Sequence, residues 1–265
     1  MAGGQMTLDS AHLPPVVAVV SPKGGSGKTA VASNLALAFA QRMPSVIVDL
    51  DMYSGDVEWA FGVQPTYRIH DVARRLREDS SSELEGMFTS RGAYLSLLCS
   101  PDSHIAADAV SGLDMATITQ RLIELNRPVV LDTSPGMSDF TLDAIEAASR
   151  IVLVTTTDVA SVQAARKLID TMQALRLDTA RVALAVNRFN SRTGLDVADV
   201  EHRLGYAASM RIPESRHVAE GLNAGRPIVE SHPDSQAATS ILGFADSLLG
   251  VTLGKRFNFW WKRPV

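Results

Sequence analysis

The sequence predicts an α/β fold in which a doubly wound, mainly parallel sheet carries helices on both faces. The chain has 265 residues, which is enough for one large domain with a buried core. Its apolar, β-branched runs, of which residues 16–20 (VVAVV) are the first, are typical of strands buried on both faces of a parallel sheet. Stretches with helical spacing separate these runs, and this alternation favours the doubly wound architecture.

The expected elements follow one another along the whole chain. The first strand covers residues 16–20, and apolar residues at helical spacing predict a helix over 28–43. A second strand is expected over 45–51, before a region of loop and helix that reaches residue 77. Further strands are expected at 93–101, 128–136, 150–157 and 181–189, further helices at 115–126, 139–149 and 160–176, and three shorter pieces near 197–204, 214–223 and 236–249.

Composition limits the classes of protein that remain. Residues 1–15 are expected to form a loose leader, 16–249 the domain, and 250–265 a basic and aromatic tail. No apolar run approaches the roughly 20 residues of a spanning helix, and the leader has no apolar signal core, so we expect a cytoplasmic protein. A net charge of −4 gives no overall basic field for nucleic acid. The single cysteine, Cys99, excludes a disulfide framework and is expected to be a core residue.

A glycine-rich loop connects the first strand to the first helix. Its sequence, SPKGGSGKTA over residues 21–30, lets the backbone approach phosphate oxygens, and the helix that follows adds a positive N-terminal end. Lys28 is expected to reach the β- and γ-phosphates and the Thr29 hydroxyl to ligate Mg²⁺. The expected nucleotide-binding residues of this loop are Gly24, Gly25, Ser26, Gly27, Lys28, Thr29 and Ala30.

The string KGGSGKT, residues 23–29, resembles the deviant Walker A loop of the ParA/MinD superfamily of ATPases. The resemblance implies a P-loop fold of the SIMIBI type, binding of ATP or ADP with Mg²⁺, slow hydrolysis, and a homodimer that forms on ATP binding. In that family the first lysine crosses the dimer interface to the partner's phosphates. Lys23 is therefore implied to stabilise charge during phosphoryl transfer in the partner, as an arginine finger does. Ala30 departs from the family, in which many members carry a second threonine.

Three acids are expected beside the phosphates, and Asp56 is a further acid nearby, with a solvated loop residue as the alternative. Asp49 and Asp51 end the second strand, and in open parallel sheets ligands lie at the carboxyl ends of strands. Residues two apart share one face of a strand, which allows both carboxylates to approach one Mg²⁺-nucleotide. By the resemblance, Asp51 orients or activates the attacking water and Asp49 acts through the water shell of the metal. Asp132 lies in PVVLDTSPG, which resembles the Walker B and switch II segment, and would hold a Mg²⁺ water or the Thr29 hydroxyl, while Gly136 would let the turn move.

The base is expected at the ends of two later segments. The string ALAVNRFN resembles the adenine-recognition strand end of the family, and the Asn187 amide matches the N6 and N7 edge of adenine. Arg188 would stack on the base or bridge the dimer, with a plain surface charge as the alternative. Pro213 and Glu214 are placed at the base by a resemblance of RIPESRHVAEGLNAGRPIV to a later segment of the family, with a plain surface charge as the alternative for Glu214.

A narrower resemblance and the tail indicate the cellular role. Residues 48–76 look most like the TadZ/CpaE branch, which implies positioning of a pilus or septum assembly through an unknown protein partner. Residues 249–263 combine aromatic and basic side chains, with Leu249, Leu253, Phe257 and Trp260 on one helical stripe, as is typical of a membrane interface. The alternatives for the tail are docking on its own domain, a disordered tail, and binding of the pilus or septum partner.

Two other functions stay open. One is a DNA-partitioning ATPase that binds DNA non-specifically through a basic face made of Arg166, Lys167, Arg192, Arg203 and Arg216. The other is a scaffold that holds nucleotide in a dimer without hydrolysing it. Turnover would separate the ATPase from the scaffold, and salt-sensitive DNA binding would favour partitioning.

Overall fold

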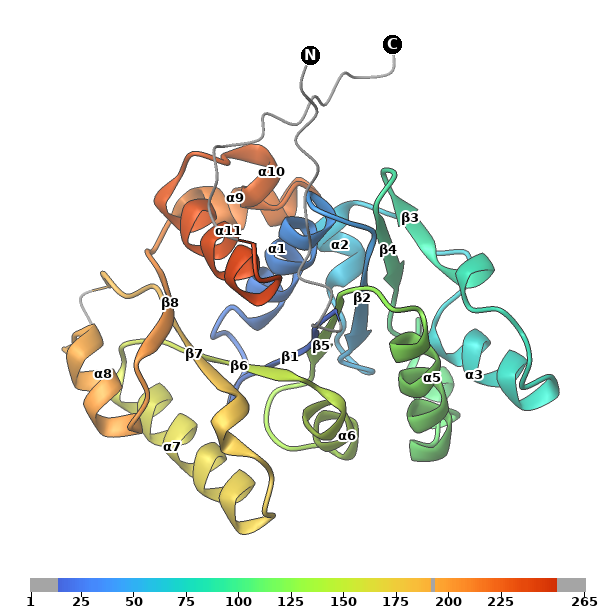
Figure 1. The fold of residues 1–265 in the computed structure, drawn as a ribbon, viewed down its shortest axis with the longest axis horizontal. Coiled ribbons are helices and arrows are strands. Elements are labelled where there is room, and N and C mark those ends of the chain that lie inside the picture. Colours follow the sequence, from blue (N-terminus) through green and yellow to red (C-terminus); the bar gives the residue numbers. More distant parts are fainter. Residues whose placement is uncertain (1–13, 192–193, 252–265) are drawn as a thin grey trace.

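The computed structural model describes residues 14–191 and 194–251, so most of the expected leader and tail lies outside the described residues. These residues form one eight-stranded sheet in the order β3-β4-β2-β5-β1-β6-β7-β8 (Figure 1). Only β3 pairs antiparallel, with β4. The strands are β1 Val16–Val20, β2 Ser45–Leu50, β3 Thr89–Arg91, β4 Leu95–Leu98, β5 Val129–Thr133, β6 Arg150–Thr155, β7 Val182–Asn187 and β8 Ala208–Ile212. The predicted fold class is confirmed.

Helices cover both faces of this sheet (Figure 1). They are α1 Lys28–Ala40, α2 Val57–Phe61, α3 Ile69–Glu78, α4 His104–Asp108, α5 Gly112–Glu124, α6 Asp139–Ala147, α7 Val159–Ala174, α8 Val197–Leu204, α9 Arg216–Asn223, α10 Ile228–Ser231 and α11 Gln236–Leu248, with 3₁₀ turns at η1 Glu85–Met87 and η2 Thr179–Arg181. In the part of the chain that the structure covers, none of these helices is long and apolar enough to cross a membrane.

The strand β1 shows how one apolar run serves two cores. Val17 and Val19 pack into the cluster under α1, α2, α10 and α11, whereas Val16, Ala18 and Val20 pack into the cluster under α3 and α5–α8. Because successive side chains of a strand point to opposite faces, a strand covered on both sides is apolar throughout. This explains why the central strands could be predicted from continuous apolar runs.

Four elements differ from the sequence-based expectation. The strands β3 and β8 and the short helices α4 and α10 were not expected. β8 lies at the edge of the sheet, and its residues alternate between exposed and buried, so it has no continuous apolar run. β3 is a three-residue edge strand with no buried residue.

Parallel pairing brings the carboxyl ends of the central strands to one edge of the sheet. Five neighbouring strands lie in the order β2, β5, β1, β6 and β7. The segment that follows each of them carries a predicted functional residue or a residue that contacts one. Asp49 on β2 lies directly opposite Asp132 on β5 in the register of the sheet. The candidate site therefore follows from the order of the strands.

We expect Gly225→Ala to destabilise the fold by about 1–3 kcal/mol, because added volume at a closely packed position forces backbone shifts. Gly225 has φ +65°, and a Cβ there would lie 2.7 Å from the backbone of Gly62, where α2 ends. Gly243→Ala on α11, where a Cβ would meet nothing within 4 Å, is the matched control. It should raise stability by about 0.5–1 kcal/mol through helix propensity. Urea unfolding measures both, and a Gly225→Ala protein as stable as the wild type would contradict the close packing of α2 against the α9–α10 connection.

Candidate functional site

A cavity of about 810 Å³ opens at the carboxyl edge of the sheet. The loop residues predicted to bind nucleotide all line it, as do Asp51, Asn187, Arg188, Pro213 and Glu214. Lys23, Asp49 and Asp132 do not. The lining also includes Asp56, the further acid expected nearby, and residues that were not predicted, namely Ser21, Ser54, Pro135, Ser215, Arg216, Val218, Ala219 and Leu222. Segments that are distant in sequence thus form one concave site.

The phosphate loop, residues 21–27, has the shape that its glycines permit. Gly27 has φ +88°, and a Cβ there would lie 2.3 Å from the side-chain nitrogen of Asn187. The hydroxyls of Ser21 and Ser26 donate to the carbonyl oxygen of Lys23 at 3.1 and 3.3 Å. The loop then enters α1 at Lys28, so that the positive end of that helix faces the cavity.

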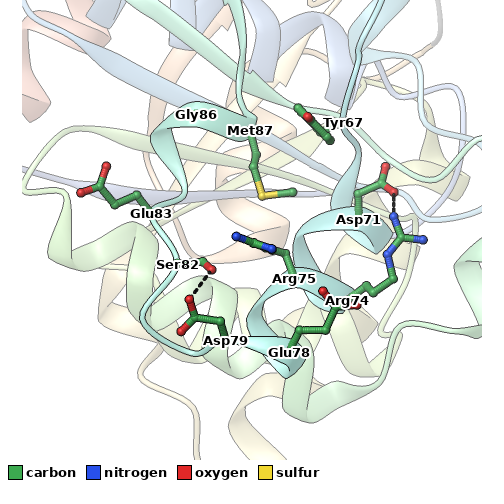
Figure 2. Close-up of a pocket in the computed structure, with 10 residues that line it drawn as sticks. All are labelled: Tyr67, Asp71, Arg74, Arg75, Glu78, Asp79, Ser82, Glu83, Gly86 and Met87. Carbon is green, nitrogen blue, oxygen red and sulfur yellow. Dashed lines mark hydrogen bonds and ion pairs between the residues drawn. The ribbon is translucent and has the colours of Figure 1, made fainter.

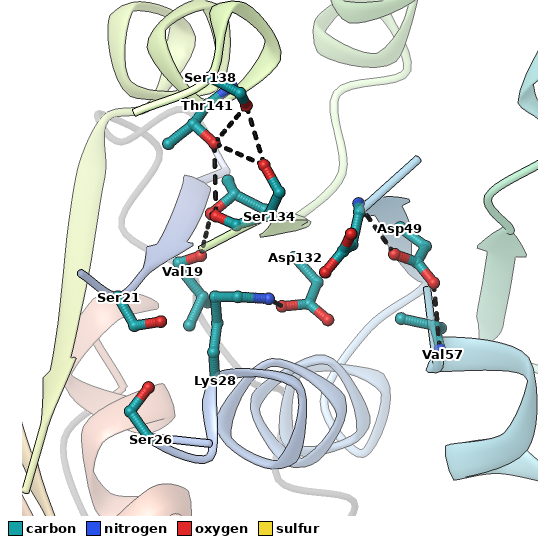
Figure 3. A network of polar contacts seen from close by, with 12 residues as sticks. Val19, Ser21, Ser26, Lys28, Asp49, Val57, Asp132, Ser134, Ser138 and Thr141 are labelled. Carbon is teal, nitrogen blue, oxygen red and sulfur yellow. Dashed lines mark hydrogen bonds and ion pairs between the residues drawn. The ribbon is translucent and has the colours of Figure 1, made fainter. Parts of the chain in front are cut away.

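Lys28 and Asp132 form a buried ion pair below the phosphate loop (Figure 3). Nζ of Lys28 lies 2.8 Å from Oδ1 of Asp132, with the side chains 6% and 0% exposed. Oδ2 of Asp132 is buried and has no hydrogen-bond partner in the described structure. A buried carboxylate oxygen without a donor is costly, so this atom is suited to a metal-bound water or a hydroxyl that arrives with the ligand.

Magnesium fits this arrangement through a small number of protein ligands. Among the described residues, no three His, Cys, Asp or Glu side chains gather as a metal site. Mg²⁺ commonly keeps several waters and is held by one or two carboxylates together with substrate phosphates. Thr29 in the cavity and the free oxygen of Asp132 match that requirement.

Asp49 makes loop contacts that its position at a strand end did not indicate. Its carboxylate accepts the backbone N–H of Asp51 and of Val57, both at 3.1 Å, and so fixes the loop that follows β2 (Figure 3). Both oxygens are occupied by this loop, and Asp49 does not line the cavity. Asp51, two residues further along the chain, lines the cavity. Burial raises the pKa of its carboxyl. A raised pKa suits a group that exchanges a proton with water.

The buried Asp49 gives a prediction for stability against pH. Burial, together with the neighbouring Asp132, raises the pKa of Asp49 from 3.8 to about 8, although the two backbone N–H groups and Lys28 oppose the shift. Between about pH 4 and about pH 8 the folded state then holds a proton that the unfolded chain has lost. Asp49 therefore contributes stability that is complete below about pH 4 and lost as the pH rises to about 8.

Urea unfolding of the nucleotide-free protein across this pH range measures the effect. We expect Asp49→Asn to remove this part of the pH dependence, because the amide does not titrate. An unchanged slope in the variant would show that Asp49 is ionised in the folded protein at neutral pH.

Lys23 lies outside the cavity and contacts its own chain. Its Nζ is 3.2 Å from Oδ1 of Asp158, and the two side chains are 43% and 36% exposed. Burial opposes ionisation of Asp158, but hydrogen bonds from Thr156, Ser161 and Lys23 outweigh it and lower the pKa of that carboxyl. An exposed ion pair of this kind is weak, so Lys23 can leave it for a stronger anionic partner at little cost.

The turn after β5, residues 134–138, is tied to the phosphate loop. The backbone N–H of Gly136, which has φ +84°, donates to the carbonyl oxygen of Ser21 at 2.9 Å. The hydroxyls of Ser134, Ser138 and Thr141 form a three-membered network with distances of 2.8, 3.0 and 3.3 Å (Figure 3). Hydrogen bonds therefore connect the phosphate loop to this turn and the turn to the start of α6.

The base side of the cavity differs from the prediction at Asn187. Its Nδ2 donates to the carbonyl oxygen of Ser26 at 2.8 Å, and its Oδ1 accepts the N–H of Arg188 at 3.0 Å. The amide therefore braces the phosphate loop rather than presenting both groups to a base. Arg188 lines the cavity with a φ of +53°. The Glu214 carboxylate accepts a hydrogen bond from Ser191 at 2.8 Å.

The sequence-based reasoning missed an apolar surface on α9. Val218, Ala219 and Leu222 line the cavity, and we call these three residues the base wall. Their spacing of one and four places them on one face of a helix, which was a readable signal. Apolar side chains opposite the phosphate loop are suited to stacking a planar base.

A second hollow of about 520 Å³ lies beside α3 and η1 (Figure 2). Side chains of both charges line it, namely Arg74 and Arg75 together with Asp71, Glu78, Asp79 and Glu83. Arg74 forms an ion pair with Asp71 at 2.7 Å. No predicted site residue lines it. Its lining residues include no glycine-rich loop and no helix that starts at such a loop, so this hollow does not resemble the nucleotide cavity.

Comparison with known proteins decides the family. A model of the CobQ/CobB/MinD/ParA nucleotide-binding domain matches residues 17–228. The chain belongs to this family. It is 27% identical over 247 residues to the uncharacterized ATP-binding protein MJ0547 of Methanocaldococcus jannaschii, covering 89% of this chain and 88% of that protein.

Solved structures of two similar proteins have the same fold as this chain. A ParA family ATPase from Chlorobium tepidum TLS gives a TM-score of 0.81 at 21% identity and covers 87% of this chain and 98% of its own. The septum site-determining protein MinD from Pyrococcus horikoshii OT3, in complex with Mg-ADP, gives 0.78 at 20% identity, with coverages of 89% and 96%. The ParA/MinD resemblance is confirmed, as are the predictions of an ATPase and of ATP or ADP with Mg²⁺. The narrower TadZ/CpaE likeness stays a prediction.

Proposed function

We propose that this protein is a switch of the MinD/ParA type, which dimerises with ATP, hydrolyses it slowly and positions an assembly at the cell envelope. The observation that carries the proposal is the cavity that joins the phosphate loop to the Lys28–Asp132 pair. Its exposed neighbour Lys23 supplies a second cation at the same edge of the sheet. Binding of one nucleotide within one chain does not require this second lysine.

The residues of the cavity divide the work of holding the nucleotide. Backbone N–H groups of the phosphate loop and Nζ of Lys28 bind the phosphates. The Thr29 hydroxyl and Asp132 hold Mg²⁺ with its waters, and the bound ion neutralises phosphate charge. Of the carboxylates that line the cavity, we assign to Asp51 the orientation of a water and the acceptance of its proton, because burial raises its pKa. The base wall covers the base.

The dimer is proposed on the geometry around Lys23. This lysine points to Asp158 and not to the cavity of its own chain, so it is available to a second copy. At the partner's γ-phosphate it would stabilise the charge that develops during transfer. The edge of the sheet that carries Lys23 would then be the face that two copies share.

The envelope role rests on the residues from 249 onward and on the relatives. The relative from Pyrococcus horikoshii is named a septum site-determining protein. The basic and aromatic tail, of which residues 252–265 lie outside the described structure, suits a lipid surface. Dimerisation doubles a weak anchor, which makes membrane binding depend on ATP.

Co-sedimentation with phosphatidylglycerol-containing vesicles tests the proposal. We expect the full chain to pellet with vesicles in a slowly hydrolysed ATP analogue and to stay in solution with ADP. Replacement of Phe257 and Trp260 by serine, on the apolar stripe of the tail, should abolish pelleting without changing nucleotide affinity.

Binding of duplex DNA without any vesicle binding would instead favour partitioning. The structure gives this alternative little support, because Arg166 pairs with Asp170 at 3.0 Å and Arg216 lies 4.0 Å from Glu220. Paired arginines make a weaker basic face than the sequence suggested. Arg192 lies outside the described residues.

A further inference from the structure

One buried amide joins the two sides of the nucleotide cavity. Asn34 lies on α1, the helix that begins at the phosphate loop, and is only 1% exposed. Its Nδ2 donates to the carbonyl oxygen of Ala30 at 2.8 Å, and its Oδ1 accepts the backbone N–H of Val229 at 2.9 Å. Ala30 lines the cavity, whereas Val229 belongs to α10, far along the chain.

The bond to Val229 is one that α10 needs. The first N–H groups of a helix have no partner within it, and Val229 is almost completely buried. Asn34 supplies the acceptor from another element. Without it, a buried donor would remain unsatisfied, and α10 would have to shift to reach water or another acceptor.

The position of α10 in turn fixes α9. A Cβ at Gly221 of α9 would lie 2.6 Å from the carbonyl oxygen of Arg226 and 3.2 Å from the hydroxyl of Ser231 on α10. The N–H of Arg226 also donates to the carbonyl oxygen of Gly221 at 2.7 Å. This leaves α9 little room to move independently of α10, and α9 carries the base wall.

We propose that Asn34 is a positioning residue that holds the base wall at a fixed place relative to the phosphate loop. It does so through Val229 and α10, and does not line the cavity itself. The inference rests on the proposed function, because it takes the ligand to be an adenosine nucleotide. Asn34 thereby sets the affinity for the nucleoside part of the ligand and leaves the affinity for the phosphates unchanged.

Calorimetric titration of the full chain with Mg-ADP and with Mg-tripolyphosphate tests this separation. Asn34→Leu keeps the volume of the side chain but removes both hydrogen bonds. We expect its Kd for ADP to rise about tenfold, while the Kd for tripolyphosphate changes by less than about twofold. Ser33→Ala is the matched control, because the Ser33 hydroxyl is buried on the same helix and has no partner in the described structure. It should leave both values unchanged.

Asn34→Asp gives a readout that loss of packing would not produce. A protonated carboxyl can donate to Ala30 and accept from Val229 as the amide does, whereas the carboxylate would face the carbonyl oxygen of Ala30. Burial raises the pKa of such a group, so ADP affinity should recover towards the wild type as the pH falls from about 8 to about 5.5. Gly221→Ala, which displaces α9 without touching Asn34, should reproduce the selective loss of ADP affinity.

Each outcome of these titrations is decisive. The inference would be overturned if Asn34→Leu lost affinity equally for ADP and for tripolyphosphate, or lost affinity for neither. An Asn34→Asp protein whose ADP affinity does not depend on pH would also overturn it. If Asn34→Leu does not fold, the Asp and Gly221 variants decide alone. If the wild-type protein bound ADP no more tightly than tripolyphosphate, the nucleoside would add no affinity, and the proposed function itself would be overturned.

Discussion

Replacement of Lys28 by alanine is expected to abolish ATP binding. Lys28 is a buried cation that lines the cavity, and it lies against the buried Asp132. Its removal takes away the ammonium that we propose binds the phosphates, and leaves the buried Asp132 carboxylate without its partner. We expect a loss of at least about 3 kcal/mol, or more than about 100-fold in Kd, measured by titration with a slowly hydrolysed ATP analogue and Mg²⁺.

A second variant separates binding from folding. Lys28→Ala alone should also lower the free energy of unfolding by about 3–5 kcal/mol, because it leaves a buried charge without its partner. The double variant Lys28→Met with Asp132→Asn removes both charges, and so should recover most of that stability while ATP still fails to bind. Recovery of ATP binding in the double variant would show that Lys28 acts only as the counter-ion of Asp132.

Replacement of Lys23 by alanine is expected to leave ATP binding intact and to remove turnover. Lys23 lies outside the cavity of its own chain, so the affinity of one chain for nucleotide should change by less than about threefold. Arginine fingers that act in trans are worth about 10³-fold or more in kcat, and a loss of that order is expected here. Steady-state phosphate release at saturating ATP measures it.

Asp158→Asn is the matched control for this prediction. It removes the charge that Lys23 contacts but keeps the lysine and the cap of α7. Because the exposed pair contributes at most about 1 kcal/mol, the variant should keep turnover, and release of Lys23 should favour the dimer slightly. Equal losses in Lys23→Ala and Asp158→Asn would instead assign Lys23 a structural role in the loop before α7.

The sequence was sufficient wherever the signal is local. The string around Lys28 combines the glycines, the lysine and the strand-to-helix transition within ten residues, and the structure assembles them as predicted. Central strands such as β1 were predictable because burial on both faces leaves one continuous apolar run. The edge strand β8 has one exposed face and was missed for the same physical reason.

Contacts between distant segments could not be predicted. The pairing of Lys23 with Asp158, the use of the Asn187 amide to brace Ser26, and the bridge from Asn34 to Val229 each join residues more than 130 positions apart. The loop contacts of Asp49 could not be predicted, because strand periodicity fixes the face of a side chain but not the loop that folds over it. Backbone donors arriving from that loop, here the N–H groups of Asp51 and Val57, leave no trace in residue spacing.

The proposed function depends most on a lysine of one chain acting at the nucleotide of another. Sedimentation equilibrium of the full chain, with Mg²⁺ and a slowly hydrolysed ATP analogue, tests this most directly. We expect the mass of two chains for the wild type, and that of one chain with ADP or when Lys23 is alanine. A wild-type protein that binds the analogue tightly and keeps the mass of one chain at all concentrations would contradict the account.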